Sequence, residues 1–72
     1  MLRHNPYTKF MAWMKEHDIT AKEIAILLNH SKSSISKKLN GTGADFTLSE
    51  VRKICLEYAI SADDYFVAYK VS

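Results

Sequence analysis

The sequence contains few residues that constrain a chain covalently or conformationally. Its 72 residues include one cysteine (Cys55), one proline and two glycines. One cysteine excludes an internal disulfide, and a free thiol is typical of a protein in a reducing cytosol. The small core of so short a chain supplies only a few kcal/mol of net stability. We therefore expect a single domain over residues 1–72, stabilised further by a partner or by weak homodimerisation.

Long apolar runs are also absent. No uninterrupted run exceeds five residues, as at residues 24–28 (IAILL), whereas a helix needs about 20 apolar residues to cross a bilayer. Residues 1–6 contain no apolar stretch of signal-peptide length. We therefore expect a cytoplasmic protein without a membrane partner.

The charge is small and unevenly distributed. Apolar residues make up 47% of the chain and charged residues 25%, which is the composition of a globular rather than a disordered protein. The net charge is +2, but residues 1–43 hold seven Lys/Arg against three acidic residues, and residues 44–72 hold three against five. The basic part of the chain is suited to phosphate groups, and a charge of this size favours weak DNA binding.

Helix-capping patterns predict the first helices. Asn5 before Pro6 has the pattern of an N-cap followed by proline, which predicts a helix over residues 6–17. The sequence TAKE at residues 20–23 is a capping box and predicts a helix over residues 20–28. Asn29 follows, and asparagine tolerates the left-handed conformation that a sharp turn needs.

The same reasoning places three more helices. A third helix is predicted over residues 32–40, opened by Ser31 or Lys32 and closed by Gly41. TLSE at residues 47–50 is a second capping box, and SADD at residues 61–64 begins a short fifth helix. Side-chain types alternate along residues 67–71, a pattern that predicts a short extended tail. The predicted fold is all-α, with one core formed by Trp13, Ile24, Leu28, Ile35, Leu39, Val51, Ile54 and Phe66.

The helices at residues 20–28 and 32–40 have the pattern of a helix-turn-helix. A three-residue turn joins them, Ala25 is small where their backbones would approach, and Ile35 is the branched residue that would fill the gap. Residues 20–41 (TAKEIAILLNHSKSSISKKLNG) resemble the helix-turn-helix of phage repressors and Cro proteins, the xenobiotic-response-element-type regulators. The resemblance extends over residues 7–66. SKKLNG with DFT, at residues 36–41 and 45–47, is similar to a variant common in phages of Gram-positive bacteria.

The resemblance implies a phage-repressor-like, Cro-like regulator of a temperate-phage lysogeny/lysis switch, located in the bacterial host cytoplasm. It would bind operator DNA through residues 32–40. Counting from Ile35 around the helix, the residues that face away from the core or flank that face are the DNA-binding candidates Lys32, Ser33, Ser36, Lys37, Lys38 and Asn40. Serine and lysine lack the bidentate geometry with which Arg reads guanine and Gln reads adenine. The alternative interpretation is an ordinary solvated helix face.

The helix predicted at residues 20–28 has two apolar residues outside its buried side. Ile24, Ala25 and Leu28 define its buried side, so Ile26 lies almost opposite and Leu27 at the boundary. The resembled family commonly has polar residues at these two positions. An exposed apolar pair beside the recognition helix indicates a protein interface, or else is simply tolerated.

The interface interpretation leads to a different function. In length and general sequence character the chain also resembles the modulator-of-repression proteins of temperate phages of lactic acid bacteria. We expect no second domain of the kind with which full repressors dimerise. In this alternative it is an antirepressor that binds a CI-type repressor and masks the repressor's DNA-binding surface. The candidate partner-binding residues are Ile26, Leu27, His30, Lys32 and Ser33.

Catalysis is not indicated by any pattern in the sequence. The three histidines and Cys55 lack metal-ligand spacing, and the serines at residues 31–36 lack a base and acid placed to activate them. No glycine-rich phosphate loop is present. We therefore expect neither an enzyme nor a metal site, cofactor or small-molecule substrate.

Overall fold

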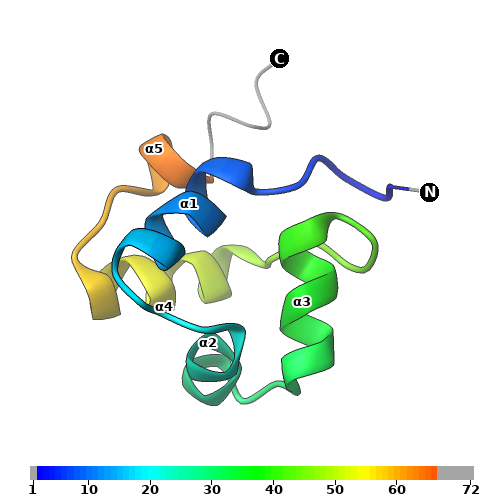
Figure 1. Ribbon diagram of the computed structural model, residues 1–72, viewed down its shortest axis with the longest axis horizontal. Coiled ribbons are helices and arrows are strands. Elements are labelled where there is room, and N and C mark those ends of the chain that lie inside the picture. The colour runs from blue at the N-terminus through cyan, green and yellow to red at the C-terminus, as the bar shows by residue number, and fades with distance from the viewer. Residues whose placement is uncertain (1, 67–72) are drawn as a thin grey trace.

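The computed structural model describes residues 2–66, and these residues form five helices (Figure 1). The all-α prediction is confirmed, and the described residues contain no strand. The tail predicted at residues 67–71 lies outside the described residues. Within residues 2–66, no helix has the length and apolarity required of a membrane span. The helices are α1 (Thr8–Glu16), α2 (Ala21–Leu28), α3 (Lys32–Asn40), α4 (Leu48–Tyr58) and α5 (Ala62–Tyr65).

Side-chain caps explain where three of these helices begin. Thr20, Ser31 and Thr47 each accept a hydrogen bond from the backbone N–H three residues later. At Thr47 the predicted capping box is complete, because the Glu50 carboxylate accepts the Thr47 N–H in return, at 2.9 Å. At Thr20 only the hydroxyl half of the predicted box is formed. Ser61 precedes α5 as predicted, but its side chain makes no capping hydrogen bond.

The prediction for the start of α1 is wrong. The helix begins at Thr8 rather than residue 6, and Tyr7 rather than Asn5 occupies the N-cap position. The preceding backbone is used elsewhere, because the N–H groups of Arg3 and His4 donate to Gly41 O at 2.6 and 3.3 Å. Tyr7 N–H donates to the carbonyl of Leu39 at 2.9 Å. The N-terminal segment therefore satisfies backbone groups at the end of α3 instead of entering a helix.

The core contains every residue predicted for it and several more. All eight predicted side chains are buried, from Trp13 to Phe66. Aromatic rings join them, and the Phe10 and Phe66 ring centroids lie 4.8 Å apart. Burial of such rings is a major source of stability in a domain with so few residues. The further buried apolar residues are Tyr7, Phe10, Met14, Ala25 and Phe46.

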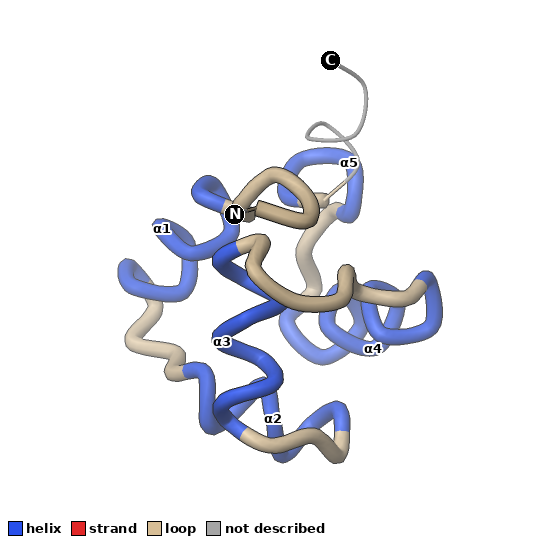
Figure 2. Tube along the Cα trace, turned by 90° about the vertical axis from the view of Figure 1, so that its right-hand side faces the viewer, coloured by secondary structure: helices blue, strands red, loops and turns tan. Residues whose placement is uncertain are grey.

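A left-handed turn sets the relation between α2 and α3. Asn29 adopts φ 59° and ψ 45°, as its residue type predicts, and α3 then leaves at a steep angle to α2 (Figures 1 and 2). Ala25 is buried at 3% exposure, and Ile35 is fully buried. Both α3 and α4 pack against α2. One side of α3 is thereby turned into the core, and its other side forms part of the protein surface.

Candidate nucleic-acid interface

The outer side of α3 is polar and accessible. Ile35 and Leu39 face the core, and the helix has one continuous face of exposed side chains. The orientation predicted by counting around the helix from Ile35 is confirmed for five of the six candidates. The exposed candidates are Lys32, Ser33, Ser36, Lys37 and Asn40, and we call them the outer face of α3.

Both ends of α3 are stabilised by local hydrogen bonds. At the start, Ser31 Oγ accepts Ser34 N–H at 3.1 Å. At the end, Gly41 adopts the left-handed conformation with φ 79°, and Thr42 N–H donates to the Lys37 carbonyl at 3.1 Å. Asn40 Nδ2 donates to the Ser36 carbonyl at 2.8 Å, so part of its amide is already used on the helix. These bonds hold the outer face on a regular helix, which positions side chains better than a loop does.

The structure corrects the expectation for Lys38. This lysine was expected to flank the outer face, but only 7% of it is exposed. Its Nζ donates to the Asp45 carbonyl at 3.1 Å and to Glu50 Oε1 at 3.2 Å, and it lies 5.7 Å from the centroid of the Phe46 ring. The long aliphatic stem lets a lysine reach inward from the border of a helix face. Its ammonium is therefore already paired within the protein and not presented to DNA.

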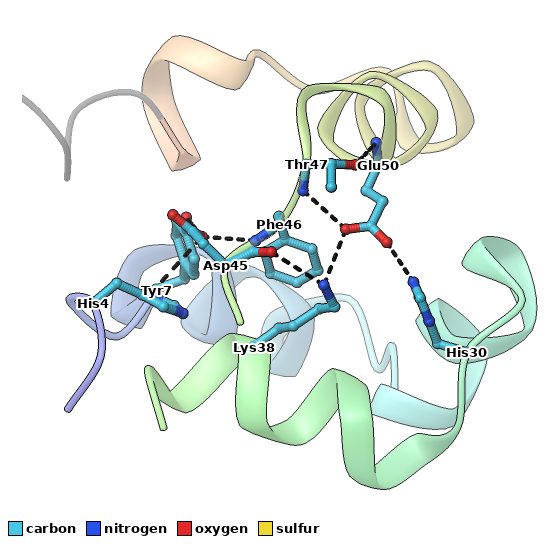
Figure 3. A network of polar contacts seen from close by, with 8 residues as sticks. All are labelled: His4, Tyr7, His30, Lys38, Asp45, Phe46, Thr47 and Glu50. Carbon is cyan, nitrogen blue, oxygen red and sulfur yellow. Dashed lines mark hydrogen bonds and ion pairs between the residues drawn. The ribbon is translucent and has the colours of Figure 1, made fainter. Parts of the chain in front are cut away.

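Glu50 is the centre of a polar network between α3 and α4 (Figure 3). Its Oε1 accepts hydrogen bonds from Thr47 N and Lys38 Nζ, and its Oε2 contacts His30 Nε2. Burial raises the pKa of the Glu50 carboxyl, but the hydrogen bonds from Thr47, His30 and Lys38 outweigh it, so the pKa lies below its ordinary value. The charged carboxylate is thus the form that the fold favours.

Residues 11–69 match the model of the Cro/C1-type HTH DNA-binding domain. The chain belongs to this family. It is a helix-turn-helix DNA-binding domain of the kind found in transcription regulators. No curated protein and no solved structure matches the chain.

The helix-turn-helix motif of this domain consists of α2, the turn at Asn29 and α3. In a helix-turn-helix the second helix is the recognition helix, which lies in the DNA major groove, while the first crosses the sugar–phosphate backbone. The second helix of the motif in this chain is α3. Its outer face holds two lysines, two serines and one asparagine, so the charge of this face is positive.

The apolar pair expected on α2 is only half present. Ile26 is 72% exposed, as predicted. Leu27 is partly buried and packs against the core cluster, so the expectation that it forms an exposed pair with Ile26 is wrong. Leu27 lies next to Leu28, and the turn of the helix brings part of its side chain onto the core.

The polar rim proposed around Ile26 also changes. Lys32 and Ser33 are exposed as expected. His30 lies at the surface but contacts Glu50 through its imidazole, so it is engaged within the domain. Within residues 2–66, no group of three or more His, Cys, Asp and Glu side chains is placed to hold a metal ion.

Sequence reasoning missed the second role of Glu50. The capping box identified its contact with Thr47, three residues away, because that contact is local. Its contacts with Lys38 and His30 span 12 and 20 residues, and no local pattern encodes such a distance. The one signal in the sequence was a lysine at the border of the predicted core face of α3.

Proposed function

We propose that this domain is a Cro-like regulator of a temperate-phage lysogeny/lysis switch that binds operator DNA through the outer face of α3. The observation that carries the proposal is the division of α3 into a buried apolar side and an exposed basic, polar side. The similarity of residues 36–41 and 45–47 to a phage variant of the fold supports the phage context. The DNA-binding residues are Lys32, Ser33, Ser36, Lys37 and Asn40, and Lys38 is left out.

The chemistry of this face defines its mode of binding. Lysines contribute attraction to phosphate that does not depend on sequence, and serine hydroxyls reach either base edges or phosphates. Asn40 is a residue type that reads adenine bidentately, but its Nδ2 already donates to the Ser36 carbonyl. We therefore propose binding dominated by phosphate contacts, with modest discrimination among base sequences.

Repeated selection from random duplexes followed by fluorescence anisotropy tests this proposal. The purified protein should enrich one motif and bind it at least tenfold more tightly than a scrambled duplex of equal length. The motif should occur between divergent promoters near the gene, and expression of the protein should reduce a reporter driven by them. Failure of the folded protein to bind any duplex at low salt contradicts the proposal, as does equal binding to all duplexes.

The exposed Ile26 favours a second candidate function, that of an antirepressor. Here the domain binds a CI-type repressor through its helix-turn-helix surface, with Ile26 as the apolar anchor and Lys32 and Ser33 at the rim. A desolvated aliphatic anchor at the centre of a small interface contributes more than about 1 kcal/mol. Because Leu27 is half-buried, the proposed anchor is a single side chain rather than a pair.

Co-purification with a CI-type repressor separates the two functions. In the antirepressor case the repressor should leave its operator when this protein is added, and Ile26→Glu should abolish that effect without changing the melting temperature. Lys37→Ala is the matched control, because it should weaken direct DNA binding and leave the protein complex intact. Full-strength pairing of a folded Ile26→Glu variant would exclude this interface.

A further inference from the structure

Glu50 contacts the turn just before the recognition helix and a lysine in the last turn of that helix. His30 immediately precedes Ser31, the N-cap of α3, and Lys38 lies in the last turn of α3. The carboxylate divides its oxygens between them, with Oε2 on His30 and Oε1 on Lys38 (Figure 3). One side chain of α4 thus links both ends of α3 to the same point.

The Glu50 carboxylate is itself held in place. Thr47 N–H donates to Oε1 at 2.9 Å, and Glu50 N–H donates to Thr47 Oγ1 at 3.2 Å. This reciprocal pair belongs to the first turn of α4, whose buried side is anchored in the core by Val51 and Ile54. The carboxylate therefore connects α3 to a rigid part of the domain rather than to a loop.

Lys38, unlike the exposed His30, has little access to water. Lys38 is 7% exposed, so its ammonium has exchanged most of its water for Glu50, the Asp45 carbonyl and the Phe46 ring. A buried ammonium that loses its counter-charge is strongly unfavourable. A hydrophobic contact has no preferred direction, whereas hydrogen bonds to two carboxylate oxygens fix Lys38 and His30 relative to the first turn of α4.

We propose that Glu50 is a positioning residue for DNA recognition, which sets the orientation of α3 on the domain and so presents its outer face to the duplex. The inference rests on the proposed use of that face for DNA. Glu50 itself need not touch DNA. Its effect on affinity arises because only molecules with α3 correctly oriented bind, and the apparent affinity falls with their fraction.

Because Glu50 is acidic, a positioning role and a simple charge effect predict opposite changes in DNA affinity when it is replaced. Removing an acidic side chain from a DNA-binding domain should by charge alone strengthen binding to phosphate. The positioning role predicts the opposite sign, because Glu50→Gln should weaken binding about tenfold if the oriented fraction falls to one tenth. Glutamine still serves at the third position of a capping box, so α4 should keep its first turn. Glu57→Gln is the matched control, being an exposed acid on the same helix with the same change in charge.

A double variant separates positioning from stability. Glu50→Gln alone leaves Lys38 buried without its counter-charge, so part of its effect is a fall in stability. Lys38→Met with Glu50→Gln removes both charges and should recover much of the melting temperature. The positioning role predicts that DNA affinity stays low in this stable double variant. A purely stabilising role predicts that affinity returns together with the melting temperature.

The experiment combines duplex binding with residual dipolar couplings, which report the angle between α3 and α4 without DNA. The probe is the duplex selected by the wild-type chain, and the measurements use the full 72-residue protein. We expect the angle to change in both Glu50 variants, the affinity to fall in both, and Glu57→Gln to bind as tightly as wild type or more tightly. Unchanged couplings in the double variant would overturn the inference whatever the affinity. If couplings change but wild type binds no duplex, the proposed DNA function fails and the role of Glu50 in orienting α3 stands.

Discussion

Gly41, the residue that caps the end of α3, lies against the backbone of His4, close to the N-terminus of the chain. A Cβ atom at Gly41 would lie 2.2 Å from the His4 carbonyl oxygen, and Gly41 also has φ 79°. The residue therefore meets two demands, a left-handed cap for α3 and space for the N-terminal segment. Either demand favours glycine, and together they make it very difficult to replace.

Gly41→Ala should accordingly destabilise the domain strongly. The left-handed conformation costs a residue with a Cβ atom about 1–2 kcal/mol, and the clash with His4 adds to this because it involves backbone. We expect a total of at least about 2 kcal/mol, measured by urea unfolding. Thr42→Ala, at the exposed next position, is the control and should change stability by less than about 0.5 kcal/mol. Equal stability of the two variants would mean that the N-terminal segment does not lie on Gly41.

Two isoleucines provide a matched test of the helix-turn-helix packing. Ile35, on the inner side of α3, is fully buried, whereas Ile26 on α2 is 72% exposed. Ile35→Ala should cost about 2–5 kcal/mol, enough to unfold much of so small a domain at room temperature. Ile26→Ala should leave the thermal transition, followed by circular dichroism, within a degree or two of the parent. A comparable destabilisation of both variants would contradict the assignment of the α2 faces.

Ala59 offers a stabilising substitution. It closes α4 in the left-handed conformation, with φ 53° and an exposed side chain. Ala59→Gly should raise the free energy of unfolding by about 0.5–1 kcal/mol, because glycine adopts this conformation without steric cost. The same change at Ala12, an exposed position inside α1, should instead lower it by about 1 kcal/mol. Chemical denaturation of the two variants checks the opposite signs.

Glu50 should make the stability of the fold depend on pH in the acid range. Its pKa is lowered in the folded state, so its contribution is fully present above the ordinary carboxyl value. The contribution is lost as the pH falls below about 4.3 towards the lower folded value. Unfolding free energies measured between pH 7 and pH 3 should therefore fall less steeply in Glu50→Gln than in the parent. Glu57→Gln should retain the parent's slope, and a parent-like slope in Glu50→Gln would contradict the prediction.

The lysines of the outer face of α3 should be visible in the salt dependence of DNA binding. Removing a lysine that neutralises one phosphate reduces the slope of log affinity against log salt concentration by about one. Lys32→Ala and Lys37→Ala should each show that reduction, while Lys15→Ala, in the last turn of α1, should not. Titrations of one duplex at several salt concentrations give the slopes. Unchanged slopes in both α3 variants would place the DNA-binding surface elsewhere.

Prediction succeeded where the structural cause is local. The helix of residues 32–40 has the expected limits because Ser31 and Gly41 are strong start and stop residues, and their effects act within one turn. The prediction for α1 failed although Asn5 and Pro6 form a good local signal. Hydrogen bonds to Gly41 and Leu39, more than 30 positions away, outweighed it.

At the candidate interface, too, the features set by local sequence were predicted and those set by distant contacts were not. Periodicity around Ile35 placed the outer face of α3 correctly, since a helix repeats every 3.6 residues whatever surrounds it. At the border of that face periodicity is ambiguous, and Lys38 and Leu27 were both expected to be more exposed than they are. Their side chains turned inward because Glu50 and the core cluster lay within reach, which is a property of the packed helices and not of α2 or α3 alone.

The sequence by itself therefore determined the all-α fold, the helix-turn-helix, its left-handed turn at Asn29 and most of the exposed face of α3. These features follow from backbone preferences and helical periodicity, which act over a few residues. Only the tertiary structure decided that Glu50 joins the two ends of α3 and that Gly41 receives the N-terminal segment. Such contacts form between groups far apart in the chain, and their geometry exists only once the helices have packed.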